Sequence, residues 1–202
     1  MIRILIAEDV NLLRGALVTL LEFEDDLEVV AAIADGAQVV PAALSHQPDV
    51  AVLDVGLPGM DGISAAALLK EELPACRSLI VTGLGRPGTL HRALEADVPG
   101  YVLKDASPEK LVRAVRAVAA GEKVYDPELA LAAWSGGVNP LTLREEEVLW
   151  LVRSGAGAPE IAARLSLSVG TVRNYLTAIV AKLNARNLVD ALRVAEESGW
   201  LI

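Results

Sequence analysis

Short apolar runs alternate with longer amphipathic stretches over the first 121 residues of the chain. The apolar runs are typical of buried parallel strands, which we expect at residues 2–7, 28–34, 49–54, 77–82 and 100–104. In the first intervening stretch, leucine and alanine side chains recur on one face of a helix. The alternation predicts an α/β domain with a doubly wound, five-stranded parallel sheet that helices cover on both faces.

This alternation stops at Gly121, which we take as the end of a first domain of residues 1–121. Residues 122–138 contain turn-forming residues and predict a linker that holds a short helix at 128–134. Residues 139–202 have helical periodicity alone, so we expect a second, smaller all-α domain there.

The second domain is expected to contain a helix-turn-helix. Thr142 and Glu145 have the spacing of a capping box, which marks the start of its first helix. We expect its helices at residues 142–154, 159–165, 168–184 and 187–198. Only a short turn, residues 166–168, joins the second helix to the third, and this is the helix-turn-helix layout.

Charge is divided unevenly along the chain, whose 202 residues carry a formal net charge of −9 at pH 7. Residues 1–121 have 10 Lys and Arg against 17 Asp and Glu, whereas residues 139–202 have 7 of each. The second domain can therefore approach an anion such as nucleic acid without the repulsion expected from the overall charge.

The composition indicates a folded protein, because 53% of the residues are hydrophobic and 22% are charged. Cys76 is the single cysteine, which excludes a disulfide framework and fits a reducing compartment. The first apolar run is too short for a signal peptide, and charges or prolines interrupt the longer ones. We therefore expect a cytoplasmic protein with no direct membrane insertion.

Acidic, hydroxyl and amine side chains lie at the carboxyl ends of four of the expected strands. Glu8 and Asp9 follow the first strand, Asp54 ends the third, Thr82 ends the fourth and Lys104 ends the fifth. Because the carboxyl ends of parallel strands meet at one edge of a sheet, these side chains should converge. Clustered carboxylates favour a hard divalent cation such as Mg²⁺, and the set suits phosphoryl transfer to Asp54. The alternative is that the acids only cap the following helices.

The third helix of the second domain has two contrasting faces. Apolar side chains that should pack inward recur at positions 169, 172, 176, 179 and 183. The opposite face, at positions 170, 173, 174, 177 and 181, is small and polar and has one arginine and no acid. Such a face could enter the major groove of DNA, where Arg pairs with guanine and Asn with adenine. The alternative is an ordinary amphipathic surface helix.

Residues 1–121 resemble the receiver domain of response regulators, a flavodoxin-like fold, through IAED (6–9), LDVGLPGMDG (53–62), IVTG (80–83) and GYVLKD (100–105). The resemblance implies that a sensor histidine kinase phosphorylates Asp54. It also implies that Thr82 and Lys104 contact the phosphoryl group and that Thr82 and Tyr101 form the switch. The implied ligands of Mg²⁺ are the side chains of Glu8, Asp9 and Asp54 and the backbone carbonyl of Gly56.

The second domain resembles the LuxR-type helix-turn-helix of NarL/FixJ response regulators, through PLTLREEEVLWLVRSG (140–155), PEIAARLSLSVGTVRNY (159–175) and IVAKLNARN (179–187). The resemblance implies binding to double-stranded promoter DNA and a homodimer when the protein is phosphorylated. The implied base contacts are Arg173, Asn174 and Thr177, and the implied phosphate contacts are Thr171 and Lys182. The implied dimer seam consists of Leu188, Ala191, Leu192 and Ala195.

Several short motifs resemble those of regulators of fatty-acid desaturation. They are GAL (15–17), EDD (24–26), RPG (86–88), YDPEL (125–129), GTVRNY (170–175) and GW (199–200). The resemblance implies a thermosensing membrane kinase and a lipid-desaturase promoter.

Two features depart from the usual family pattern. The GLGRPGT loop, residues 83–89, replaces a more acidic loop, and either it alters switching or Pro87 simply starts the next helix. Pro159 and Ala163 stand where many relatives have Lys or Arg, which predicts weak DNA binding by a monomer and dependence on a dimer.

Two other functions compete with the DNA-binding response regulator at this point. One is an enzyme, such as a phosphatase, that uses Asp54 as a nucleophile in turnover. Such an enzyme would use a second aspartate, two residues after the nucleophile, as a general acid. Gly56 occupies that position in this chain. The other is a constitutive DNA-binding module whose first domain serves only for dimerisation.

Overall fold

The computed structural model describes residues 1–83, 87–126, 130, 139–198 and 200–201. The chain divides into two compact units, and the division between Ala130 and Leu131 falls within the expected linker. The expected helix at 128–134 lies outside the described residues except for Ala130. Each unit is described below by itself.

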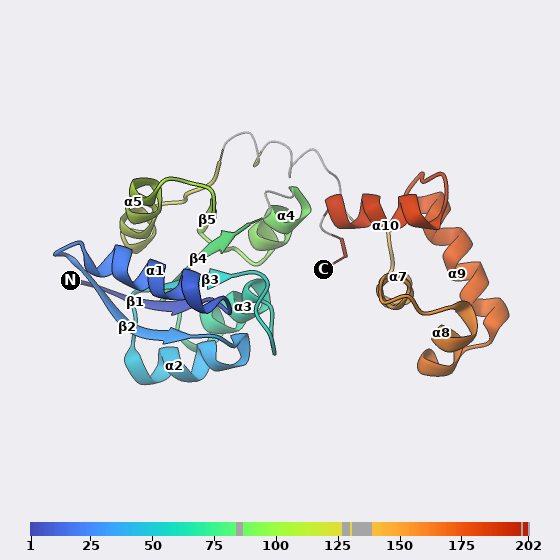
Figure 1. The fold of residues 1–202 in the computed structure, drawn as a ribbon, viewed down its shortest axis with the longest axis horizontal. Helices are drawn as coiled ribbons and strands as arrows, with labels where there is room; N and C mark the ends of the chain where they lie inside the picture. Colours follow the sequence, from blue (N-terminus) through green and yellow to red (C-terminus); the bar gives the residue numbers. More distant parts are fainter. Residues whose placement is uncertain (84–86, 127–129, 131–138, 199, 202) are drawn as a thin grey trace. The chain divides into compact units, whose positions relative to one another are not determined.

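The first unit contains the predicted parallel sheet, whose strand order is β2-β1-β3-β4-β5 (Figure 1). The strands are β1 (Ile2–Ala7), β2 (Leu27–Ile33), β3 (Val50–Asp54), β4 (Arg77–Thr82) and β5 (Gly100–Leu103). Every residue of β3 is buried, as expected for a central strand covered on both faces. The apolar runs therefore predicted all five strands to within one residue at each end.

Helices cover both faces of this sheet. They are α1 (Asn11–Glu22), α2 (Val39–His46), α3 (Gly62–Glu72), α4 (Pro87–Glu95) and α5 (Pro108–Ala119), with a 3₁₀ turn, η1 (Gly36–Gln38), before α2. Residues of α1 and α5 pack together into one core cluster on one face of the sheet. With this strand order, the right-handed crossovers usual for parallel strands place α2, α3 and α4 on the other face. Pro87 is the first residue of α4. It therefore starts this helix, which is one of the two interpretations that the sequence allowed for this loop.

The first residues of the expected linker pack against the first unit. The Val124 backbone accepts a hydrogen bond from Tyr101 N at 2.8 Å and donates one to the Pro99 carbonyl at 2.8 Å. The Tyr125 hydroxyl donates to the Val98 carbonyl at 2.5 Å. This segment therefore extends the edge of the sheet beside β5, an arrangement that turn-forming composition alone did not predict.

The second unit consists of helices in its described part. They are α7 (Leu143–Arg153), α8 (Ala158–Leu165), α9 (Val169–Lys182) and α10 (Leu188–Glu197). The capping box of Thr142 and Glu145 is present, and Ser168 and Asn187 cap α9 and α10 through their side chains. The turn at residues 166–168 joins α8 to α9, so the helix-turn-helix layout is confirmed. Among the helices of the described ranges, none has the length and apolar character that a membrane span requires.

The core of the second unit includes Val148, Leu149, Ile161, Val172 and Ile179, all with a relative exposure of 0%. Ala191 and Ala195 of α10 belong to the same core and are also 0% exposed. The small α10 side chains thus let this helix pack closely on the unit that contains it.

Candidate metal centre and nucleic-acid interface

The strand register brings the predicted site residues to one edge of the sheet. Ala7 pairs with Leu53, so Glu8 and Asp9 follow β1 beside Asp54 at the end of β3. Asp54 pairs with Val81, and Thr82 pairs with Leu103. The four strand ends are therefore level, and all five predicted polar side chains are placed at the same edge.

Three carboxylates form the centre of this edge. Glu8, Asp9 and Asp54 each offer an oxygen atom, and these atoms all lie within 4.8 Å of one another. Asp9 is exposed, whereas Glu8 and Asp54 are buried, with relative exposures of 1% and 8%. Oxygen ligands with one side open to solvent fit a hard cation that retains water, which is the preference of Mg²⁺.

Lys104 provides the positive charge of the site. Its Nζ lies 2.8 Å from Glu8 Oε2 and 3.0 Å from Asp54 Oδ1. Burial alone would lower the pKa of Lys104, but the hydrogen bonds to these two carboxylates outweigh it and raise the pKa above its ordinary value. The ammonium group therefore remains charged at neutral pH and is placed to neutralise an oxyanion at Asp54.

The loop after Asp54 requires glycine at two positions. A Cβ on Gly62 would lie 2.0 Å from the Asp54 backbone oxygen, so only glycine fits beside the end of β3. Gly59 has a φ of +74°, and a Cβ there would lie 2.3 Å from Asp35 Oδ1. A Cβ on Gly56 would lie 3.4 Å from Asp54 Oδ2, so this residue borders the second oxygen of Asp54. The expected role of the Gly56 carbonyl as a cation ligand stays a prediction.

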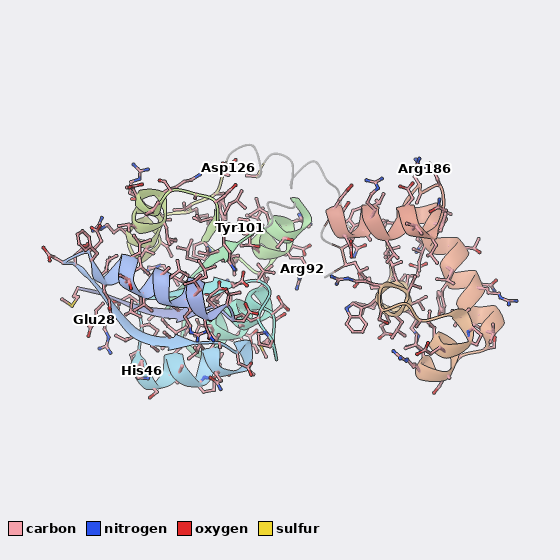
Figure 2. All side chains as sticks on the ribbon, viewed as in Figure 1. Glu28, His46, Arg92, Tyr101, Asp126 and Arg186 are labelled. Carbon is pink, nitrogen blue, oxygen red and sulfur yellow. The ribbon has the colours of Figure 1, made fainter. Side chains whose placement is uncertain are left out.

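The two residues expected to form the switch are both buried. Thr82 is 5% exposed, and its backbone carbonyl accepts a hydrogen bond from Lys104 N at 2.8 Å. Tyr101 of β5 is 2% exposed and lies inside the unit (Figure 2). Their coupled movement stays a prediction.

One contact near this loop was not predicted from the sequence. Asp61 caps α3 and also pairs with Arg92 of α4, whose Nη2 lies 3.4 Å from Asp61 Oδ1. Arg92 thus connects α4 to the loop that follows the predicted phosphoacceptor. A charge pair separated by 31 residues leaves no local signal in the sequence.

The helix expected to contact bases presents the predicted polar face to solvent. Arg173, Asn174 and Thr177 of α9 are exposed, whereas Val172 and Ile179 on the other side are fully buried. The Thr177 hydroxyl donates to the Arg173 carbonyl at 3.0 Å, one turn earlier in the helix. The exposed face carries no acidic side chain, so it can approach DNA.

The two expected phosphate contacts already have partners within the unit. Thr171 lies in the first turn of α9, and its hydroxyl is 2.8 Å from Ser168 Oγ. The Nζ of Lys182 lies 2.7 Å from Oε2 of the buried Glu145, which also accepts hydrogen bonds from the Thr142 backbone and hydroxyl. The Lys182 side chain is 38% exposed. The sequence predicted the capping role of Glu145 but gave no sign of this ion pair.

The four residues of the expected dimer seam differ in exposure. Ala191 and Ala195 are completely buried in the core of their own unit, and Leu188 and Leu192 are half-buried against it. In the single chain the two alanines therefore pack inward, and the dimer seam stays a prediction. The exposed side of α10 and the preceding turn instead carry Val189 and charged residues such as Arg186 (Figure 2).

The first unit has an acidic sheet edge that contains a lysine, and the second has a helix-turn-helix with an exposed polar face. Together these two features are those of a DNA-binding response regulator. Residues 4–116 match the response regulator receiver domain, and residues 139–195 match the luxR family of bacterial regulatory proteins. The chain therefore belongs to the NarL/FixJ family of two-component response regulators.

Individual relatives agree with this assignment. The chain is 45% identical over 200 residues to the transcriptional regulatory protein DesR of Bacillus subtilis, with 99% of each chain covered. It is 42% identical over 203 residues to the response regulator RamR of Streptomyces coelicolor, with 99% of this chain and 98% of RamR covered. A structure of the RcsB–DNA complex has a TM-score of 0.66 and 26% identity, and the match covers 97% of this chain and 98% of the RcsB chain.

Proposed function

We propose that Asp54 accepts a phosphoryl group from a sensor histidine kinase and that this modification controls DNA binding by the second unit. The convergence of Glu8, Asp9, Asp54 and Lys104 at one sheet edge supports the proposal most strongly. A carboxylate oxygen of Asp54 would form the new bond to phosphorus as the bond to the histidine nitrogen breaks.

The residues around Asp54 have complementary roles in this proposal. Glu8, Asp9 and Asp54, with the Gly56 backbone carbonyl, would hold Mg²⁺ beside the acceptor oxygen. When bound, Mg²⁺ would neutralise phosphoryl oxygens and orient them for in-line transfer. The Lys104 ammonium would neutralise another phosphoryl oxygen.

A coupled change in two further residues would transmit the modification. The Thr82 hydroxyl would move toward the phosphoryl group and donate a hydrogen bond to it, and Tyr101 would then reposition. The surface formed by α4, β5 and α5 would change as a result.

The second unit would read promoter DNA with α9. Arg173, Asn174 and Thr177 would face the bases, and Thr171 and Lys182 would lie near phosphates. A homodimer formed on phosphorylation would span two half-sites and compensate for the few basic residues of each unit. The short motifs and the 45% identity to DesR support control of membrane-lipid desaturation as the process regulated.

Phosphorylation can be tested directly. The full chain is incubated with acetyl phosphate and Mg²⁺, and its intact mass is measured beside that of Asp54→Asn. We expect the mass of one added phosphoryl group in the wild type alone. An unmodified wild type, or equal modification of Asp54→Asn, would contradict the proposal.

The same samples test the two competing functions. Rapid turnover of a small phosphate ester would favour a phosphatase, although Gly56 stands where that chemistry needs a second acid. DNA binding that is the same with and without phosphorylation would favour a constitutive module.

A further inference from the structure

The first unit has a pocket at the opposite edge of the sheet from Asp54. Strand β4 begins at Arg77, which lines this pocket, and ends at Thr82, which belongs to the acidic edge. The pocket has a volume of about 220 Å³, and α3, the turn before β5 and the segment after α5 also line it. It is therefore separate from the predicted phosphorylation site.

Positive charge exceeds negative charge in this pocket. Among the described residues that line it, three are cationic, Lys70, Arg77 and Lys123, and one is acidic, Asp97, so the net charge is +2. The surrounding domain has the opposite balance, because residues 1–121 carry 10 Lys and Arg against 17 Asp and Glu. A local excess of cations in an acidic unit favours an anionic ligand.

Asp97 holds the two lysines of the pocket in place. Lys70 Nζ lies 2.8 Å from Asp97 Oδ2, and Lys123 Nζ lies 3.4 Å from Asp97 Oδ1. All three side chains are more than half exposed, so these ion pairs are weak and an anion can compete for the ammonium groups. Arg77 donates from Nη1 to the Ala119 carbonyl at 3.0 Å, which fixes its guanidinium group at the end of α5.

Ser78 adds a buried hydroxyl group to the same pocket. It is the second residue of β4, is 6% exposed and lines the pocket next to Arg77. Within the described ranges, no hydrogen bond involves this hydroxyl. Because buried polar side chains generally have a hydrogen-bond partner, this hydroxyl indicates a site for a ligand that accepts a hydrogen bond.

We propose that this pocket binds a small phosphate monoester. Such an ester carries a charge of about −1.5 to −2 at neutral pH, which complements the charge of the pocket. Lys70, Arg77 and Lys123 would neutralise the phosphoryl oxygens, and the Ser78 hydroxyl would donate a hydrogen bond to one of them. The volume of 220 Å³ is below the roughly 300–1,000 Å³ of sites for drug-sized ligands, which favours a small ester over a nucleotide.

The test titrates the full chain with glycerol 3-phosphate in the absence of Mg²⁺ and at constant ionic strength. Backbone amide NMR shifts locate the bound ester, and calorimetry gives the dissociation constant. Glycerol and inorganic phosphate are titrated in parallel. Ser78→Ala, Lys70→Gln and Asp97→Asn change the pocket, whereas Ser45→Ala and Lys110→Gln make matched changes on exposed parts of α2 and α5. Circular dichroism verifies that each variant is folded.

We expect glycerol 3-phosphate to bind with a dissociation constant of about 1 mM or below and to shift the amides of Ser78, Gly121 and Lys123. Ser78→Ala and Lys70→Gln should each weaken binding by about tenfold, as for a lost hydrogen bond to a charged group. Asp97→Asn should strengthen binding by about threefold or more, because it removes the acid that competes for both lysines. The two control variants should bind like the wild type.

Three results would overturn the proposal. The first is the absence of saturable shifts at these amides, and the second is shifts confined to the acidic edge or to the second unit. The third is wild-type binding by both Ser78→Ala and Lys70→Gln. Glycerol or inorganic phosphate that binds as tightly as the ester would overturn the assignment of an ester. None of these results would affect the proposed function, because the pocket and Asp54 lie at opposite edges of the sheet.

Discussion

Lys182 is an expected DNA contact that also forms an ion pair with Glu145. We therefore predict that substitution of Lys182 lowers the stability of the second unit. Lys182 ends α9, and Glu145 lies in the first turn of α7, so the pair connects the start of the second unit to the helix expected to read DNA. In Lys182→Met, the Glu145 carboxylate would stay buried, and among the described residues the Thr142 backbone and hydroxyl would remain as its partners.

The size of the effect follows from the burial of the two partners. Breaking a buried ion pair costs roughly 3–5 kcal/mol, whereas an exposed pair contributes roughly 0.2–1 kcal/mol. The Glu145 side chain is 6% exposed and that of Lys182 is 38% exposed, so an intermediate value applies. We expect Lys182→Met to lower the free energy of unfolding by about 2 kcal/mol, or the midpoint temperature by roughly 10 °C.

Tryptophan fluorescence can report this change in the full chain. The three tryptophans are Trp134, Trp150 and Trp200, and all of them follow the first unit in the sequence. Urea unfolding of Lys182→Met, Glu145→Gln and the double variant gives the coupling between the two side chains. Arg164→Met removes the exposed ion pair with Glu160 and should change the unfolding free energy very little.

Removing the carboxylate charge should rescue part of the loss. We expect the double variant to be more stable than Lys182→Met, because it leaves no buried charge without a partner. A Lys182→Met chain as stable as the wild type, or additive losses in the double variant, would refute the reasoning. Weaker DNA binding by Lys182→Met would then have to be assigned to a lost phosphate contact alone.

Four further predictions follow from other contacts. Arg173→Ala should cost about 1–3 kcal/mol of discrimination at one base pair without changing stability, as measured by binding to a set of single-base operator variants. Burial tends to raise the pKa of Glu145, but hydrogen bonds to Lys182 and the capping box lower it below 4.5. The second unit should therefore lose stability as pH falls below that value, and Glu145→Gln should flatten this dependence in urea titrations at several pH values. Burial raises the pKa of Cys76 to about 12, so thiol reagents should leave the folded chain unmodified at neutral pH by mass spectrometry. Gly62→Ala should lower the midpoint of the first unit by circular dichroism, because its Cβ would clash with the Asp54 carbonyl.

The sheet and its acidic edge could be predicted from sequence because both depend on local patterns. A buried parallel strand is a continuous apolar run, and the residue that ends it lies at the same edge as the ends of the other strands. Five such runs therefore placed Asp54 and Lys104 together although 50 residues separate them. The capping box and N-caps of the second unit also lie within four residues and are visible as motifs.

Contacts between distant side chains could not be predicted in this way. Glu145 and Lys182 are 37 residues apart, and Asp61 and Arg92 are 31 residues apart. The surface that covers a helix face could not be predicted either, because an apolar stripe does not say which element packs on it. In α10 the small side chains of Ala191 and Ala195 allow packing within the same unit.

The central claim is that phosphorylation of Asp54 controls the affinity of the second unit for DNA. The most direct measurement is a footprint on genomic DNA with and without beryllofluoride and Mg²⁺, for the wild type and Asp54→Asn. We predict protected sites that the phosphoryl mimic strengthens in the wild type and leaves unchanged in Asp54→Asn. Protection that is equal in all four samples would contradict the account.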